Sequence, residues 1–406
     1  YITAIAVIIM IIYLGYYGYY QSNILLPEHL IIPETTSEKT QEKPVKSHHL
    51  VNSSPQEIDV LKAQLYLILE KEQLYLEEDL TLGGLAEQVK TTDKKLSALL
   101  NHYLHITFYD LHQEVSKLAG GLLEFGLKKG DTTIIYMPMI PQAIYAMLAC
   151  VRIGVIHSVV FGGFAPHELA IRIDDCKPKA IITASSGIEV KKIIPYKPFV
   201  DEAIKQSTYK PKNVIVYERN LGVEVPKKEY DIDYTTLVKN ALSIEPIEVA
   251  STDPSYILYT SGTTGKPKGI IRDTGGYATA LKFSMKYIYG VKKGEVFWAA
   301  SDVGWVVGHS YIVYGPLINR NTTILFEGKP IKTPDASTFW RVISEHKVSV
   351  MFTAPTAIRA IKKEDPKGKF IKKYDLSSLK YQFLAGERCD VSTLKWTQKK
   401  LKIPVK

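Results

Sequence analysis

Short apolar runs alternate with segments of helical spacing over most of this chain, and this alternation restricts the fold more than any other feature. Helical spacing is seen, for example, over 141–153 and 166–175. The apolar runs have the length of buried strands and occur at 134–136, 156–160, 180–183, 213–217, 296–301, 322–327, 349–353 and 379–384. Strands that alternate with helices predict an α/β fold, a mostly parallel sheet with helices on both faces. We expect this α/β domain to occupy residues 109–406.

The composition limits the class of protein. Of the 406 residues, 46% are hydrophobic and 23% charged, which excludes disordered, collagen-like and purely coiled-coil chains. The net charge of +9 arises after residue 108, because residues 1–108 carry eight Lys against thirteen acidic residues. A positive field suits an enzyme of anionic substrates, and a solvated lysine-rich surface explains it equally well. Cys150, Cys176 and Cys389 lack the spacing of a disulfide framework or a zinc site, so we expect buried free thiols in a reducing cytosol.

The first twenty residues contain no charged side chain. A helix of this length spans roughly 30 Å, the thickness of the hydrocarbon core of a bilayer, and the sequence predicts a single transmembrane helix over 1–20. A buried core helix and a cleaved signal sequence are the alternatives. Residues 21–55 contain Pro27, Pro33, Pro44 and Pro55 among polar residues and are predicted to form a flexible linker.

Residues 56–108 predict a small all-α unit. Helical spacing over 80–89, a turn at 90–92 and a second helical segment at 93–104 are typical of a helix-turn-helix. The pattern resembles the first DNA-binding unit of AraC-type regulators, in which the second helix would present Lys94, Lys95 and His102 to DNA. The segment carries five Lys against nine acidic residues, so phosphate binding would be weak. A helical pair that packs for structure or binds protein is the alternative.

A loop rich in glycine, hydroxyl and lysine side chains follows the apolar strand 256–259. Glycines let backbone amides approach an anion, the hydroxyls donate hydrogen bonds, and the lysines supply positive charge. The predicted polyphosphate-binding residues are Thr260, Ser261, Gly262, Thr263, Thr264, Gly265, Lys266 and Lys268. The loop is not a Walker A motif, because Pro267 follows Lys266.

This loop resembles the phosphate loop of the adenylate-forming superfamily. Further stretches resemble its short-chain branch, the acetyl- and propionyl-CoA synthetases, namely 136–141, 159–164, 300–311, 352–359 and 384–390. Residues 271–277 and 385–390 are more similar to the propionyl type. The resemblance runs from 108 to 406 and implies an incomplete large domain of such an enzyme.

The resemblance implies a ligase that first joins propionate or acetate to ATP as an acyl-adenylate and then transfers the acyl group to CoA, with Mg²⁺ as cofactor. It implies phosphate binding by 260–268 and nucleotide binding by Gly386, Glu387 and Arg388. It places Trp305, Val306 and Val307 around a small acyl pocket. Where the family often has an arginine pair for the phosphates of CoA, this sequence has Glu189 and Lys192, so Lys192 is the predicted CoA-binding residue.

The resemblance also implies that the chain is part of a longer protein. The family's Trp-Trp-Gln-Thr-Glu-Thr-Gly stretch would begin near Val405, and its catalytic lysine is expected beyond Lys406, so we assign no catalytic residue and no metal ligand within the chain. A membrane-tethered DNA-binding regulator fused to an enzyme remnant is the alternative, and a module that binds ATP or acyl-adenylate without turnover is a third. The predicted location is the cytoplasmic face of a membrane, or the cytoplasm if the N-terminal segment is an artefact.

Overall fold

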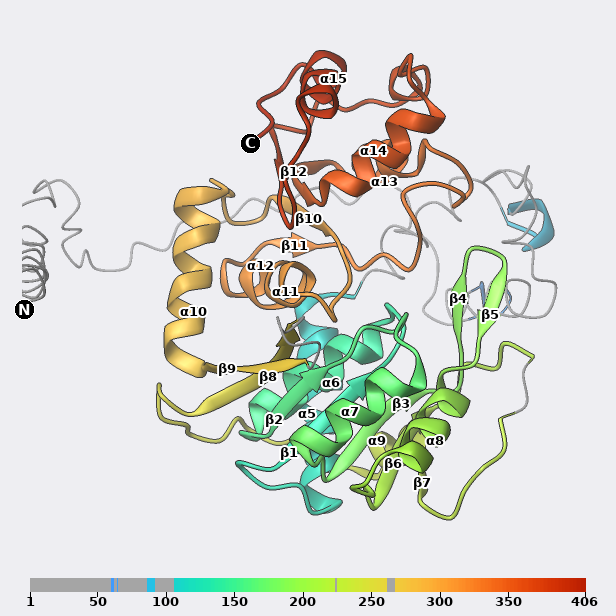
Figure 1. Ribbon diagram of the computed structural model, residues 1–406, viewed down its shortest axis with the longest axis vertical. Helices are drawn as coiled ribbons and strands as arrows, with labels where there is room; N and C mark the ends of the chain where they lie inside the picture. The colour runs from blue at the N-terminus through green and yellow to red at the C-terminus, as the bar shows by residue number, and fades with distance from the viewer. Residues whose placement is uncertain (1–59, 62–63, 65–85, 92–105, 223–224, 261–266) are drawn as a thin grey trace, which may run out of the picture. The chain divides into compact units, whose positions relative to one another are not determined.

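The computed structural model describes residues 60–61, 64, 86–91, 106–222, 225–260 and 267–406 (Figure 1). The chain divides into two compact units, residues 1–52 and 53–406, and all described residues belong to the second. The predicted transmembrane helix, the linker, and the predicted DNA contacts Lys94, Lys95 and His102 lie outside the described residues. Within the ranges above, no helix has both the length and the apolar character needed to cross a bilayer.

The larger sheet has seven strands, and the prediction of an α/β fold with a mostly parallel sheet is confirmed. All neighbouring pairs are parallel except the last, β8 with β9. In sheet order the strands are β7 (Asp231–Asp233), β6 (Asn213–Tyr217), β3 (Ala180–Ala184), β1 (Thr132–Tyr136), β2 (Ile156–Val159), β8 (Pro254–Thr260) and β9 (Lys268–Asp273).

A second sheet of four parallel strands follows in the chain and is drawn in orange and red in Figure 1. Its order is β11 (Thr322–Thr323), β10 (Val296–Ala300), β12 (Val348–Thr353) and β13 (Tyr381–Leu384). An antiparallel hairpin, β4 (Gly187–Glu189) with β5 (Lys192–Ile194), belongs to neither sheet.

Proline starts several of the helices that follow strands. It occupies the first turn of α6, α7 and α14. Its fixed φ is helical, and an N–H in the first turn would have no partner within the helix, so its absence costs no hydrogen bond. The helices are α5 (Phe108–Glu124), α6 (Pro141–Arg152), α7 (Pro166–Cys176), α8 (Tyr196–Gln206), α9 (Tyr234–Asn240), α10 (Thr274–Phe283), α11 (Val306–Gly308), α12 (Gly315–Ile318), α13 (Thr338–His346), α14 (Pro355–Glu364) and α15 (Val391–Leu401). Two π-helical segments, η3 (Ser284–Ile288) and η4 (His309–Tyr314), and one 3₁₀ segment, η5 (Ile371–Lys373), complete the described elements.

Alternate residues of the strands enter different cores, as period-two geometry requires. Ile134 of β1 packs with α7 and α8, whereas its neighbour Ile135 packs with α5 and α6. In the second sheet, Trp298 packs with α13 and α14, whereas Phe297 joins the core that also contains Ile135. Both faces of each sheet are therefore covered, and one core connects the two sheets.

One predicted strand is shorter than expected. The apolar run at 322–327 pairs only through Thr322 and Thr323, so the predicted length was wrong. Beyond Thr323 the chain leaves the edge of the sheet, and Glu327 pairs instead with Arg219 at the end of β6. The three cysteines are free thiols, and the predicted burial is confirmed for Cys150 and Cys176 but wrong for Cys389, which is half-buried in the turn before α15.

Candidate functional site

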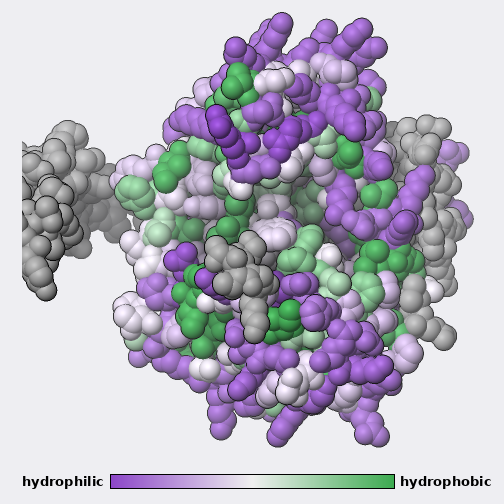
Figure 2. Space-filling view, in the orientation of Figure 1, coloured by the Kyte–Doolittle hydropathy of each residue, from purple (hydrophilic) through white to green (hydrophobic). Residues whose placement is uncertain are grey.

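A cavity of about 790 Å³ opens where strands of both sheets end. Its wall includes residues that directly follow β1 and β2 of the larger sheet, and residues at the ends of β10 and β12 of the second sheet. In α/β folds, ligands bind beyond the carboxyl ends of parallel strands, because the loops there carry the variable side chains. The hairpin β4–β5, the loop 326–330 and residues of α8, α13 and α14 also line the cavity. On the face of the molecule shown in Figure 2, hydrophilic residues dominate the periphery and more hydrophobic residues lie nearer the centre.

The two ends of the predicted phosphate loop lie at this strand-end edge. Thr260 is the last residue of β8 and Lys268 the first of β9, and the two are paired across the antiparallel ladder. Strand β8 runs parallel to β2, whose continuation at 161–163 lines the cavity. Both side chains are exposed and are available to an anion. The other predicted residues of this loop, Ser261, Gly262, Thr263, Thr264, Gly265 and Lys266, lie outside the described residues.

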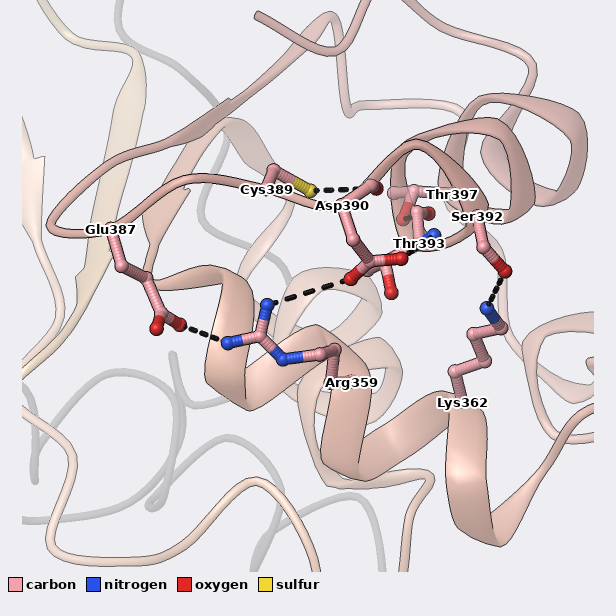
Figure 3. A network of polar contacts seen from close by, with 8 residues as sticks. All are labelled: Arg359, Lys362, Glu387, Cys389, Asp390, Ser392, Thr393 and Thr397. Carbon is pink, nitrogen blue, oxygen red and sulfur yellow. Dashed lines mark hydrogen bonds and ion pairs between the residues drawn. The ribbon is translucent and has the colours of Figure 1, made fainter.

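The predicted nucleotide motif follows β13 beside the cavity. Leu384 of β13 pairs with Thr353, a residue of the cavity wall, and Gly386 then turns the chain with a φ of 100° that favours glycine. Arg359 of α14 donates to Glu387 at 2.5 Å and to Asp390 at 3.5 Å, while Asp390 caps α15 through the amide of Thr393 (Figure 3).

These contacts determine what the motif can offer to a ligand. The carboxylate of Glu387 is already paired with a cation, whereas the side chain of Arg388 is exposed at the turn. The loop 386–390 is held in place from α14, and none of its residues lines the cavity. Whether these three residues bind nucleotide stays a prediction.

The predicted acyl-pocket residues separate in the structure. Trp305 lies on the cavity wall and packs against Phe161 and Phe164, with ring centroids 5.1 and 5.8 Å away. Val306 is 53% exposed and Val307 packs against the core between the sheets, and neither lines this cavity. Successive residues entering helix α11 point in different directions, which the sequence pattern alone does not reveal.

Asp302 is a half-buried carboxyl group on the cavity wall that the sequence analysis did not single out. Its Oδ1 accepts the Gly304 amide at 2.8 Å, and burial raises the pKa of the carboxyl to about 6. A Cβ on Gly308 would lie 1.9 Å from the carbonyl oxygen of Asp302, so only glycine fits there. The sequence feature that could have identified Asp302 is its position in the stretch 300–311, directly after an apolar strand.

The hairpin brings Glu189 and Lys192 close to each other, as ladder partners at its turn. Glu189 lines the cavity and pairs with Lys329 at 2.8 Å, and this bond, with a further contribution from Lys192, holds the pKa of Glu189 below its ordinary value. Lys192 is exposed beside the cavity rather than on its wall. Lys329 is a second residue that the sequence analysis did not single out.

The described residues offer little to a metal ion. No three His, Cys, Asp or Glu side chains in the part of the chain that the structure describes lie close enough together to hold one. Mg²⁺ binds through carboxylates and phosphate oxygens, and the carboxylate of Glu387 is already paired with Arg359.

Comparison with known proteins identifies the family. The family model of AMP-binding enzymes matches residues 85–406. The chain is 55% identical over 310 residues to acyl-CoA synthetase short-chain family member 3, mitochondrial, of Bos taurus, covering 76% of this chain and 45% of that protein. It is 49% identical over 301 residues to a propionate–CoA ligase of Salmonella typhimurium, covering 74% of this chain and 48% of that protein. The chain thus spans about half the length of the curated relatives it matches. It belongs to the AMP-binding enzyme family.

Proposed function

We propose that this chain is the adenylating part of a short-chain acyl-CoA synthetase. The reaction would join propionate or acetate to ATP as an acyl-adenylate, with release of pyrophosphate, and then transfer the acyl group to the thiol of CoA. The observation that carries the proposal is the cavity at the strand ends of both sheets, with Trp305 on its wall and the ends of the glycine-rich loop beside it. Relatives named as short-chain acyl-CoA synthetase and propionate–CoA ligase support it.

The first step would place negative charge on the departing pyrophosphate. Donors and cations that are held in position stabilise such charge more than mobile water does. Thr260 and Lys268 stand at the two ends of the glycine-rich loop, with exposed side chains. We propose that residues 260–268 hold the phosphates and that Gly386, Glu387 and Arg388 contact the nucleotide. ATP would bring Mg²⁺ as its counterion.

The carboxylate would bind against Trp305. Its indole packs on Phe161 and Phe164, so the wall is aromatic at this point. An aromatic wall discriminates by about 1 to 3 kcal/mol per methylene. Val306 and Val307 do not line this cavity. We propose that they affect the acyl pocket only as the chain neighbours of Trp305. Lys192 and the hairpin would face CoA.

Binding of non-reactive adenylate esters to the chain tests this proposal. The propyl ester of AMP mimics propionyl-adenylate, and the hexyl ester adds three methylenes. Calorimetry should show tighter binding of the propyl ester than of AMP, and weaker binding of the hexyl ester. In Trp305→Ala the affinity for the hexyl ester, relative to the affinity for the propyl ester, should rise at least tenfold. Lack of binding of any adenosine nucleotide, or equal binding of both esters by the unchanged chain, would contradict the proposal.

The segments that precede the α/β domain carry predictions of their own: a transmembrane helix, a linker and a helix-turn-helix. The family match begins at residue 85, inside the segment 56–108 predicted as a helix-turn-helix, so the adenylating function has support and the DNA-binding alternative has none. We propose that the α/β domain proper begins at α5, since Thr107 and Asp110 form a reciprocal capping box at its first turn. Limited proteolysis followed by mass spectrometry tests this boundary: a stable fragment should start near Thr107.

A further inference from the structure

Helix α7 carries a buried cation. The side chain of Arg172 is only 5% exposed, on a helix that otherwise packs apolar residues such as Leu169 and Ile173 into the core. Its Nη1 donates to the backbone oxygen of Glu168 at 2.5 Å and to Oε2 of the same residue at 2.9 Å. Burial of a charge is costly, so the groups that surround this guanidinium group show what it stabilises.

The guanidinium group faces two aromatic rings, and its Cζ lies 4.6 Å from the ring centroid of Phe164 and 5.4 Å from that of Tyr259. A cation over the face of an aromatic ring is attracted by the ring, and more strongly where water is excluded. Phe164 packs edge-on against Trp305 of the cavity wall, with 5.8 Å between the ring centroids. Tyr259 directly precedes Thr260, where the glycine-rich loop begins. Arg172 therefore connects the cavity wall with the base of that loop.

The same helix also holds the hydroxyl group of Tyr259. Tyr259 is buried, and its Oη donates to Oδ2 of Asp175 at 2.6 Å. Asp175 follows Arg172 by three positions on α7, so both side chains lie on one face of the helix. One side chain of α7 thus fixes the ring of Tyr259, and the other fixes its hydroxyl group.

Tyr259 lies at the base of both strands that carry the glycine-rich loop. In the antiparallel ladder it pairs with Gly269, and the next pair toward the loop is Thr260 with Lys268. A Cβ at Gly269 would lie 3.2 Å from Cε1 of Tyr259, so the ring packs closely on the backbone of the second strand. The position of this ring therefore influences both Thr260 and Lys268, whose side chains are exposed.

We propose that Arg172 is a positioning residue that holds Tyr259 against Phe164 and so fixes the two ends of the glycine-rich loop relative to the cavity wall. This inference rests on the proposed function, in which Thr260 and Lys268 bind the phosphates of ATP. Arg172 is buried and acts through Tyr259 rather than on the ligand. Loss of the cation should therefore weaken the binding of ATP, whereas AMP, which lacks the two outer phosphates, should bind almost unchanged.

Calorimetric titration of the full chain with ATP and with AMP tests the proposal. Arg172→Met removes the charge and keeps a long side chain, and it should weaken ATP binding about tenfold and AMP binding less than about twofold. The carboxylate of Glu168 is left without its partner but is 41% exposed, so water can solvate it. Arg172→Lys keeps a cation that can lie over the rings, and its ATP affinity should stay within about threefold of that of the unchanged chain.

The matched control is Arg152→Met. Arg152 on α6 is also a largely buried arginine, 11% exposed, and its Nε donates to the backbone oxygen of Ile244 at 2.8 Å. It does not line the cavity, so this variant should bind ATP and AMP as the unchanged chain does. Phe164→Leu is a second test, because it removes one of the two rings that the guanidinium group faces. It should weaken ATP binding about threefold and leave AMP binding unchanged.

Urea denaturation shows first that each variant is folded. The same ratio of ATP affinity to AMP affinity in folded Arg172→Met and in the unchanged chain overturns the proposal. So does an equal loss of ATP affinity in Arg172→Lys and Arg172→Met, because the cation would then not be what holds the ring. If Arg172→Met does not fold, unchanged ATP affinity of Phe164→Leu overturns the proposal. In each of these cases the adenylating function stands as long as the unchanged chain binds ATP, and if it binds no adenosine nucleotide, both fail.

Discussion

Arg219 and Glu327 form a two-bond ion pair that joins the larger sheet to the loop that follows β11 of the second sheet. Nη1 of Arg219 donates to Oε1 at 2.7 Å and Nη2 donates to Oε2 at 2.9 Å. Arg219 follows β6, whereas Glu327 lies 108 positions later in the chain. Their side chains are only 14% and 22% exposed, so water screens the pair weakly.

Arg219→Lys should destabilise the chain even though it keeps the charge. A lysine cannot donate two parallel bonds, so one carboxylate oxygen of Glu327 is left in a half-buried place. We expect a loss of about 1 to 2 kcal/mol in the free energy of unfolding, measured by urea denaturation. The matched control is Arg341→Lys, since Arg341 pairs with Glu345 at 3.0 Å on an exposed helix surface. That variant should lose less than about 0.5 kcal/mol. Equal losses in the two variants would contradict the special role of Arg219.

Asp302→Asn should stabilise the chain more at neutral pH than in acid. The carboxyl of Asp302 has a folded pKa of about 6, raised by burial from 3.8, so the folded state binds the proton more tightly than the unfolded state. The free energy of unfolding therefore falls as pH rises from about 4 to 6. Asp302→Asn has no carboxyl group at this position, so its free energy of unfolding does not fall for this reason. The gain from the substitution should be about 2 kcal/mol larger at pH 7.5 than at pH 4.5.

Asp375→Asn is the control of opposite sign. Hydrogen bonds from Ser377 and Lys347 hold the pKa of Asp375 below its ordinary value, so its contribution to stability is present at neutral pH and is lost in acid. This variant should lose stability at pH 7.5 relative to the unchanged chain. A gain for Asp302→Asn that is the same at both pH values would show that burial does not perturb this carboxyl.

The histidine pair between β2 and η4 should make the chain sensitive to acid. Nε2 of His157 lies 3.4 Å from Nε2 of His309, and Tyr314 Oη lies 3.1 Å from the same atom of His157. Burial lowers the pKa of His309 to about 3, and burial together with the neighbouring ring lowers the pKa of His157. Below pH 6.5 these two histidines bind protons in the unfolded chain but stay neutral in the folded chain. The free energy of unfolding therefore falls as the pH falls.

His309→Gln removes one of these two groups. At pH 7.5 the variant should have a lower free energy of unfolding than the unchanged chain, because packing around position 309 is altered. At pH 5 this difference should be about 2 kcal/mol smaller, because the variant lacks a histidine that binds a proton only in the unfolded chain. Urea denaturation at the two pH values measures the change. A deficit that is constant with pH would contradict the assignment of acid sensitivity to this pair.

The two lysines of the glycine-rich loop should contribute most of the electrostatic attraction for ATP. Lys266→Ala combined with Lys268→Ala should weaken ATP binding at least tenfold in calorimetry, because two charge-assisted contacts to phosphate are lost. The matched control is Lys372→Ala combined with Lys373→Ala, which removes two exposed adjacent lysines of η5. The control should bind ATP as the unchanged chain does. Equal affinity of both double variants would contradict phosphate binding by this loop.

The sequence by itself determined the class of the fold and the position of most strands. Buried parallel strands are continuous apolar runs, and runs such as 180–183 and 213–217 became β3 and β6 with almost unchanged bounds. Burial is a local property of such a run, so periodicity reveals it. The prediction was wrong in length at 322–327, because an edge strand ends where a side chain finds a better partner, as Glu327 does in Arg219.

Only the tertiary structure decided which strand ends meet and which side chains share the cavity. The order β7-β6-β3-β1-β2-β8-β9 brings the end of β8 beside the end of β2, and no local pattern encodes that order. Asp302, Glu189 and Lys329 come from separate segments, and Val306 turns away although Trp305 beside it faces the cavity. The physical reason is that local periodicity specifies whether a residue is buried, whereas its partner depends on the packing and register of elements that lie far apart in the chain.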